Sequence, residues 1–239
     1  MNRQEVRPGR VLICDLDGTL VDSAPDLASA VGDLLTQAGR APLSEAAVRR
    51  MVGDGVAKLV ERALAASGGV PEAGALAGLV ARYMAFYESR MTELTRPYPG
   101  AVETLTNLKA AGWRLAVCTN KPEGPSHGLL TALGLDGLFE AVAGGDTYAV
   151  KKPDPGHVRG ILNALGAAPG EAVMLGDSLN DVLAARGAGV PVIAIASGYG
   201  PVPAHELGAD ALIATFAELP AALDRLATAS QPTHPGPFA

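Results

Sequence analysis

Residues 11–23 read VLICDLDGTLVDS, an apolar run that leads straight into two carboxylates one residue apart. The run is short, continuous and rich in branched side chains, so Val11–Cys14 is expected to be a buried strand. Side chains two apart in a strand point to the same side, so Asp15 and Asp17 can face one cavity at the strand's carboxyl end. Two neighbouring carboxylates repel each other unless a proton or a cation lies between them. Mg²⁺ suits such a place, because it is a hard ion that prefers oxygen ligands.

Similar apolar runs recur along the second part of the chain, with segments of helical spacing between them. The runs are WRLAVCT, AVAGG, AVMLGD, PVIAIA and the weaker DALIA, and the helical segments include AVETLTNLKAAG, EGPSHGLLTALG and DPGHVRGILNALG. Continuous apolar strands that alternate with helices predict an α/β fold, a Rossmann-like parallel sheet core with helices on both faces. Sites in such sheets form outside the carboxyl ends of the strands.

One long stretch breaks this alternation. From residue 25 to 96 the sequence has helical patterns only, as in PDLASAVGDLLTQAGR and ALAGLVARYMAFYESRM. We therefore expect an α/β core formed by residues 1–24 and 97–227, with an inserted all-α cap domain at 25–96. Residues 228–239 are rich in proline and poor in apolar side chains, which predicts a disordered tail.

The bulk composition excludes several classes of partner. The 239 residues are 48% hydrophobic and carry a formal net charge of −6. This charge argues against a general nucleic-acid or membrane-surface binder, although a few local cations would suffice for a small anionic substrate. No apolar run is long enough to span a bilayer, and the polar N-terminus has no secretory apolar segment behind it. We expect a cytoplasmic protein that is a monomer or a homodimer.

The cysteines and histidines give weaker expectations. Cys14 and Cys118 each precede a candidate site residue at a strand end, so we expect close but reduced thiols on one face of adjacent strands. The histidines have no metal-ligand spacing, and all four are expected at the surface: His127, His157, His205 and His234.

The paired carboxylates have a natural use in phosphoryl transfer. Asp15, ionised at neutral pH, is a competent nucleophile toward phosphorus, and Asp17 can protonate the departing alkoxide and then deprotonate water. Gly18 permits a sharp turn whose N–H groups can hold phosphate oxygens. Short acids are also common in ordinary turns, so Asp-x-Asp alone leaves both interpretations open.

Three further strand ends carry polar residues. In LAVCTNKP, Thr119 and Asn120 can donate to a phosphate oxygen or simply cap a helix. In KKPDP, a lysine can lie beside the nucleophile and offset its negative charge. The alternative is a solvated lysine at the surface. In VMLGDSLND, the offset of four places Asp181 near Asp177 if a helix begins between them, and Asp177 is otherwise a helix cap.

These motifs, in this order, resemble those of the haloacid dehalogenase-like hydrolase superfamily. The resemblance implies catalytic roles for Asp15, Asp17 and Thr119, and for Lys152 because it directly precedes a proline. Lys151 is then a solvated surface charge. The resemblance also implies Mg²⁺ held by Asp15, Asp17, Asp177 and Asp181, with Asp181 either a ligand or an orienter of Lys152. Because dehalogenating members lack the second aspartate as acid and base, Asp17 favours a phosphatase or a mutase.

The stretches VGDGVAKLVERAL, VCTNKP and PYPGAVETL resemble bacterial phosphoglycolate phosphatases. The implied reaction is hydrolysis of 2-phosphoglycolate, a small phosphorylated metabolite, to glycolate and phosphate. Alternatives are another small phosphate-ester phosphatase, a pyrophosphatase, a β-phosphoglucomutase-like mutase or a non-catalytic binder. Gly53 and Gly55 would let a cap loop approach the substrate. The candidate cations for the substrate carboxylate are Arg49, Arg50 and Lys58, each of which can equally be a solvated helix charge.

Overall fold

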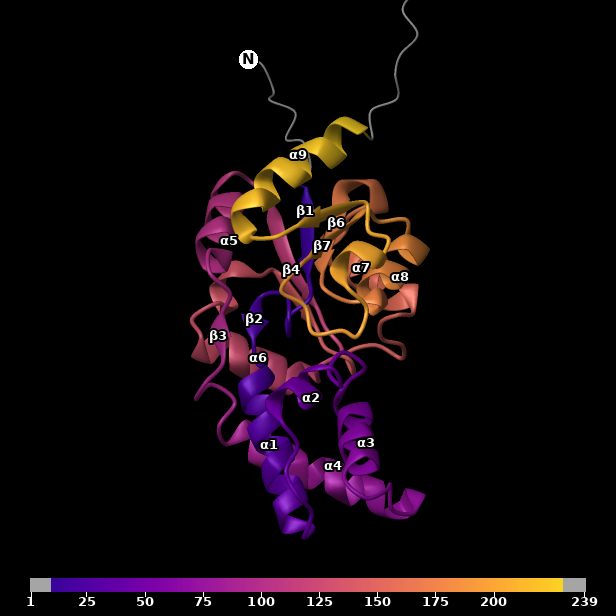
Figure 1. Ribbon diagram of the computed structural model, residues 1–239. Coiled ribbons are helices and arrows are strands. Elements are labelled where there is room, and N and C mark those ends of the chain that lie inside the picture. The colour runs from indigo at the N-terminus through magenta and orange to yellow at the C-terminus, as the bar shows by residue number, and fades with distance from the viewer. Residues whose placement is uncertain (1–9, 230–239) are drawn as a thin grey trace, which may run out of the picture.

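The computed structural model describes residues 10–229, and its core is a parallel sheet of six strands (Figure 1). Their order across the sheet is β5-β4-β1-β6-β7-β8, and every neighbouring pair is parallel. The strands are β1 (Val11–Cys14), β4 (Arg114–Cys118), β5 (Ala141–Ala143), β6 (Ala172–Gly176), β7 (Val192–Ile195) and β8 (Ala211–Ile213). The predicted α/β sheet is confirmed.

The opening strand β1 lies near the centre of this sheet, and all four of its side chains are fully buried. Its alternate residues serve two cores. Leu12 and Cys14 pack into the apolar cluster on one face, and Val11 and Ile13 pack into the cluster on the other. Burial on both faces is why the strand is a continuous apolar run rather than an alternating one.

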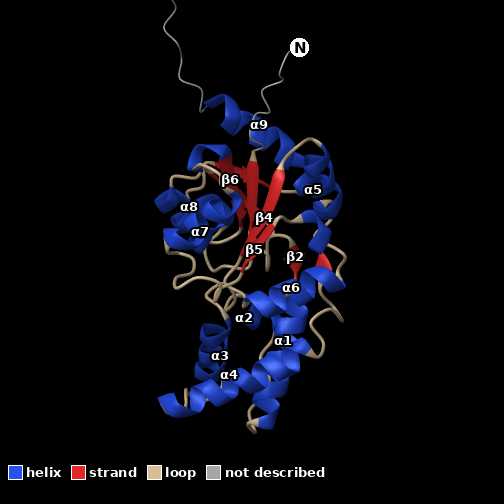
Figure 2. Cartoon of the chain, turned by 180° about the vertical axis from the view of Figure 1, so that it is seen from behind, coloured by secondary structure: helices blue, strands red, loops and turns tan. Residues whose placement is uncertain are grey.

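Helices cover both faces of the sheet (Figure 2). On one face lie α5 (Ala101–Ala110), α6 (Glu123–Ala132) and α9 (Leu219–Ala229), and on the other α7 (Pro155–Leu165) and α8 (Leu179–Ala188). Single turns of 3-10 helix complete the connections: η1 (Asp136–Leu138), η2 (Pro169–Glu171), η3 (Ala204–Glu206) and η4 (Phe216–Glu218). Helix α9 runs to Ala229 and so includes the first two residues of the expected tail, and residues 230–239 lie outside the described part.

Four helices form a separate lobe below the carboxyl edge of the sheet in Figure 1: α1 (Ala24–Gln37), α2 (Glu45–Arg49), α3 (Val56–Ala66) and α4 (Ala73–Glu88). They enclose their own apolar cluster, which includes Leu35, Val60 and the stacked rings of Tyr83 and Tyr87. We call this lobe the helical insert. Among residues 10–229, no helix combines the length and the apolar character needed to cross a bilayer.

A short antiparallel pair joins the helical insert to the core. Strand β2 (Val21–Asp22) leads into the insert, and β3 (Arg96–Pro97) leads out of it. The helical reading of 25–96 missed this pair, because two-residue strands leave no periodic pattern in a sequence.

The two cysteines are reduced and lie on neighbouring strands as expected, but the expectation that they share one face is wrong. Strands β1 and β4 are neighbours, but Cys14 lies opposite Val117 rather than Cys118. This offset by one residue sends the thiols to opposite faces of the sheet, Cys14 into one core and Cys118 into the other. Both thiols are free, and burial raises the pKa of Cys118 to about 12.

Candidate active site

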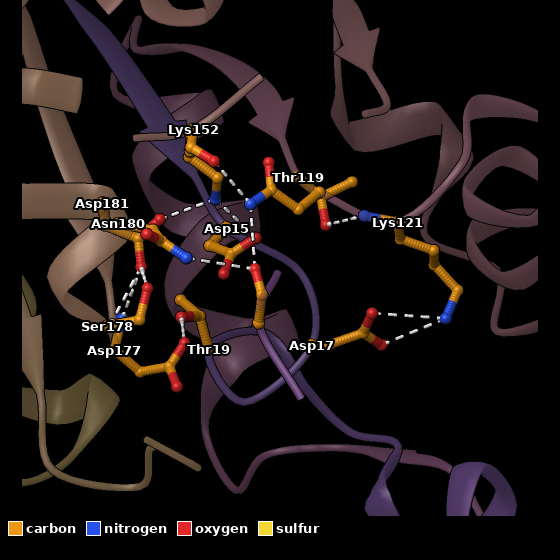
Figure 3. Close-up of polar contacts among 12 residues, drawn as sticks. Asp15, Asp17, Thr19, Thr119, Lys121, Lys152, Asp177, Ser178, Asn180 and Asp181 are labelled. Carbon is orange, nitrogen blue, oxygen red and sulfur yellow. Dashed lines mark hydrogen bonds and ion pairs between the residues drawn. The ribbon is translucent and has the colours of Figure 1, made fainter. Parts of the chain in front are cut away.

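Polar residues gather at the carboxyl ends of the central strands (Figure 3). Asp15 follows β1, Thr119 follows β4 and Asp177 follows β6, and all three are buried. Parallel strands end at one edge, so buried strands that each lead into a polar residue bring these side chains together. The structure thus assembles in space residues that lie far apart in the sequence.

A buried group of carboxylates is the centre of the site. One oxygen each of Asp15, Asp177 and Asp181 lies within 4.8 Å of the others. Helix α8 begins at Leu179, between Asp177 and Asp181, which confirms the condition under which the offset of four brings them together. The Thr19 hydroxyl donates to Asp177 Oδ1 at 2.7 Å, and the Tyr199 N–H donates to Oδ2 at 3.0 Å.

Lys152 lies between two of these carboxylates and is almost fully buried. Its ammonium is 2.8 Å from Asp15 Oδ1 and 2.6 Å from Asp181 Oδ1. This contact fits the expectation that Asp181 orients Lys152. The neighbouring Lys151 is exposed, as expected, but it also donates to the Asp54 main-chain oxygen at 2.8 Å.

The protonation of the carboxylates reflects their crowding. Burial raises the pKa of Asp15 to about 8; Lys152 opposes this rise, and the charges of Asp181 and Asp177 add to it. Burial also raises the pKa of Asp177 to about 6, helped by Asp181. The three carboxylates repel one another, which disfavours their ionisation. They fit a hard divalent cation, which prefers oxygen ligands and would offset that repulsion.

His157 contradicts the expectation of a surface histidine. It is fully buried, and its ring meets Tyr148 edge-on with centroids 5.9 Å apart. Its Nδ1 accepts a hydrogen bond from the Lys152 N–H at 3.2 Å, so this nitrogen carries no proton. Burial and the Lys152 charge lower its pKa to about 4, so His157 supports the Lys152 backbone as a neutral ring. His127 and His205 are exposed as expected, and His234 lies outside the described residues.

Among the described residues Asp17 does not belong to the carboxylate group; its side chain points to Lys121 instead (Figure 3). It accepts from the Ser23 hydroxyl at 2.6 Å and lies 3.2 Å from the ammonium of Lys121. Lys121 is itself buried and lies over the ring of Tyr87, 4.3 Å from its centroid. Sequence reasoning missed Lys121, and its position directly after Thr119 and Asn120 was the one available signal.

The predicted donation from Asn120 to a phosphate does not hold in this conformation. Its amide nitrogen donates to the Gly53 oxygen at 2.9 Å and to the Lys152 oxygen at 2.8 Å, which engages both of its N–H groups. Asn120 therefore ties the core to the insert loop. Thr119 keeps its hydroxyl proton free for a ligand, since Oγ1 accepts from the Lys121 N–H at 3.2 Å.

Of the three glycines named in the sequence analysis, Gly18 and Gly55 lie in close contact with other residues and Gly53 does not. A Cβ on Gly18 would be 2.6 Å from Asp177 Oδ2, so this turn is pressed against the carboxylate group. A Cβ on Gly55 would be 2.8 Å from Lys151 Nζ and 3.1 Å from the Asn120 oxygen. Gly53 has open space around it but a φ of +121°, a conformation that favours glycine.

A pocket lies between the core and the helical insert. Its lining from the core is Asp15, Asp17, Thr119, Asn120 and Lys121, and from the insert Leu27, Val52, Gly53, Gly55, Val56 and Leu59. The three cations expected for the substrate carboxylate do not line it. Arg49 pairs with Asp22 and Glu45, Lys58 pairs with Glu61, and Arg50 lines a different groove. None of the three candidate cations therefore lines this pocket, although Arg49 lies over the ring of Tyr199 and Arg50 borders core residues in the other groove.

The fold and this site define a class of enzyme. The family model described as haloacid dehalogenase-like hydrolase matches residues 12–195. The chain belongs to this family.

Relatives within the family are named phosphoglycolate phosphatase. One from Caulobacter vibrioides is 44% identical over 220 residues, which covers 92% of this chain and 93% of the relative. One from Rhodospirillum rubrum is 46% identical and covers 88% and 89%. The crystal structure of a predicted phosphoglycolate phosphatase from Haemophilus somnus has a TM-score of 0.86, 31% identity and coverage of 91% and 99%. CbbY from Rhodobacter sphaeroides, solved in complex with phosphate, has a TM-score of 0.75, 29% identity and coverage of 88% and 96%.

Proposed function

We propose that this chain is a phosphatase that hydrolyses 2-phosphoglycolate to glycolate and phosphate through an aspartyl-phosphate. The observation that carries the proposal is the pair Asp15 and Asp17 at the end of β1, each with its own buried lysine. The names of the similar proteins from Caulobacter and Rhodospirillum support the choice of substrate.

The reaction divides between the two aspartates. A carboxylate oxygen of Asp15 attacks phosphorus, the bond from phosphorus to the ester oxygen breaks, and Asp17 gives its proton to the departing glycolate oxygen. Water then attacks the phosphoryl group of the intermediate and gives a proton to Asp17, and the bond to Asp15 breaks. Lys152 compensates the charge that collects on Asp15 and the phosphoryl oxygens. The free hydroxyl of Thr119 is placed to donate to one of those oxygens.

Mg²⁺ is the proposed cofactor, held by Asp15, Asp177 and Asp181. When bound, it supplies positive charge that keeps Asp15 ionised and stabilises the phosphoryl oxygens. Asp17 as a further ligand stays a prediction, since its side chain points to Lys121. Thr19 and Tyr199 would hold the Asp177 carboxylate in place for the ion.

The helical insert is proposed to act as the cap of the site, with residues 1–24 and 97–227 as the catalytic core. Support comes from its separate apolar cluster and from the pocket at its border with the core. A cytoplasmic location, and a monomeric or homodimeric state, remain predictions.

A substrate panel tests the proposed function. With Mg²⁺ present, we expect a higher kcat/KM for 2-phosphoglycolate than for 2-hydroxyethyl phosphate, pyrophosphate and β-glucose 1-phosphate. Asp15→Asn should lower kcat by at least about a thousandfold while the far-ultraviolet circular dichroism is unchanged. Turnover by a folded Asp15→Asn protein, with deamidation excluded by mass spectrometry, would disprove the nucleophile. A parent enzyme with no preference for 2-phosphoglycolate would disprove the substrate alone.

A further inference from the structure

We infer that Lys121 binds the carboxylate of the substrate and thereby selects phosphate esters that carry an acid next to the ester carbon. The inference rests on the proposed function and names the residue that gives it specificity. Lys121 was not among the cations expected from the sequence, and its position in the folded chain carries the argument.

Lys121 supplies the positive charge of the pocket. Among the described residues that line the pocket it is the one cationic side chain, and its side chain is 4% exposed. Its backbone is fixed at both ends: its N–H donates to Thr119 Oγ1 at 3.2 Å, and its oxygen accepts from the Gly145 N–H at 2.8 Å. The ammonium is therefore held at a defined place in the pocket.

The two lysines of the site are paired differently. Lys152 makes contacts of 2.6 and 2.8 Å with two carboxylates, the lengths of strong charge-assisted hydrogen bonds. Lys121 makes longer contacts, 3.3 and 3.2 Å, with the two oxygens of the single carboxylate of Asp17. Among the described residues Lys152 contacts two carboxylates and Lys121 contacts one, so by charge Lys121 is the lysine of the pair that can take a second anion.

The chemistry of the substrate places its carboxylate near this ammonium. In 2-phosphoglycolate a single methylene separates the carboxyl carbon from the ester oxygen. Asp17 must reach that ester oxygen to protonate it, and Lys121 lies 3.2 Å from Asp17. Any side chain in contact with the acid is therefore close to a carboxylate attached at the adjacent carbon.

One residue of the helical insert lies against Lys121, although it does not itself line the pocket. Tyr87 from α4 places its ring 4.3 Å from the ammonium of Lys121, and this contact stabilises the charge. The phenol oxygen of Tyr83, one turn away on the same helix, is buried and has no hydrogen-bond partner among the described residues. Buried polar groups without partners are rare and typically belong to sites that hold water or a polar ligand.

The test compares two substrates that differ in the acid group: 2-phosphoglycolate and 2-hydroxyethyl phosphate. Lys121→Met removes the charge and keeps an unbranched apolar side chain. We expect it to lower kcat/KM for 2-phosphoglycolate at least about tenfold more than for 2-hydroxyethyl phosphate, with the difference in KM. Lys121→Arg keeps the charge and should retain most of the preference, which guards against a folding defect in the Met variant. Lys58→Met removes an exposed, paired lysine of the insert and should leave the ratio of the two substrates unchanged.

Each outcome has a separate meaning. If the parent enzyme prefers 2-phosphoglycolate and Lys121→Met loses the same factor on both substrates, Lys121 serves Asp17 alone and the inference is wrong. If Lys58→Met changes the ratio and Lys121→Met does not, the carboxylate site lies on the insert instead, which also overturns it. A parent enzyme without the preference contradicts the proposed function before Lys121 is tested.

Discussion

The balance of positive and negative side chains determines the protonation of the carboxylates in this site. Asp15, Asp177 and Asp181 share one buried corner, and Lys152 supplies the one positive charge that contacts two of them. One lysine does not balance three carboxylates, and the pKa of Asp15 is accordingly raised to about 8. If Asp15 is the nucleophile, as proposed, it needs more positive charge nearby before it is ionised near neutral pH.

The first prediction concerns pH and Mg²⁺. The pKa values of Asp15 and Asp177, about 8 and about 6, lie above the ordinary 3.8, so without metal the folded protein binds more protons than the unfolded chain. The free energy of unfolding without metal should therefore fall as pH rises from about 4 to about 8. Mg²⁺ needs ionised carboxylates, so its affinity should rise between pH 6 and 8 with release of protons. Titration calorimetry in buffers of different ionisation enthalpy measures the affinity for Mg²⁺ and the number of protons released. A constant affinity over this pH range would contradict the prediction.

The residues at strand ends were predictable because their signal is local. A buried strand followed by Asp15, Thr119 or Asp177 is visible in the sequence, and a parallel sheet brings such ends together. The side chains that failed prediction depend on partners distant along the chain. The position of Lys121 depends on its contact with Tyr87 of the insert, and the burial of His157 depends on its packing against Tyr148.

Among the elements, the loop before α3 joins the insert to the core through several hydrogen bonds. Asn180, from α8, donates to Asp54 Oδ1 at 2.7 Å and to the Gly53 oxygen at 3.3 Å. With the bonds from Asn120 and Lys151, these contacts attach the loop to the core while it forms one wall of the pocket.

The second prediction is that Asn180→Ala loosens this loop. We expect a rise in KM for 2-phosphoglycolate of about tenfold and a smaller effect on p-nitrophenyl phosphate, because the insert is proposed to cover the organic part of the substrate and this loop forms one wall of the pocket. Hydrogen exchange of residues 51–56 should become faster in the variant. Asn163→Ala, an exposed asparagine on α7, is the matched control. Unchanged exchange in Asn180→Ala would show that the loop is held by other contacts.

Element types were also easier to predict than strand register. The alternation of apolar runs and helices gave the sheet, but it could not tell that Cys14 faces Val117 rather than Cys118. Register depends on how neighbouring strands slide, and a shift of one residue exchanges the faces of every side chain. Strands β2 and β3 were missed for a related reason, since each is stabilised by pairing with the other and neither has a pattern of its own in the sequence.

At the scale of the whole molecule, one carboxylate fastens the start of the helical insert to its end. Asp26, in the first turn of α1, is buried and accepts from the Leu94 N–H at 3.0 Å, the Thr95 N–H at 2.8 Å and the Thr95 hydroxyl at 2.6 Å. The insert thus leaves and returns through one compact junction, formed by this contact and the pair β2–β3.

The third prediction is that Asp26→Ala destabilises the protein by about 2–3 kcal/mol, because buried donors lose a charged acceptor. Urea unfolding measures the change, and Asp26→Asn, which keeps one acceptor oxygen, should lose less. Asp33→Ala, in the same helix, removes a half-exposed ion pair with Arg90 and should cost at most about 1 kcal/mol. An equal loss for Asp26→Ala and Asp33→Ala would contradict the structural role of the buried contact.

The antiparallel pair β2–β3 also determines where the helical insert could be replaced by another segment. Asp22 and Arg96 lie side by side although seventy-odd residues separate them, so the chain leaves the core and returns to it at almost the same point. The six-stranded sheet therefore receives the same connection whatever is spliced between these two residues. A different helical lobe, or a tight turn in its place, could be exchanged at this junction without moving any strand that carries Asp15, Thr119 or Asp177.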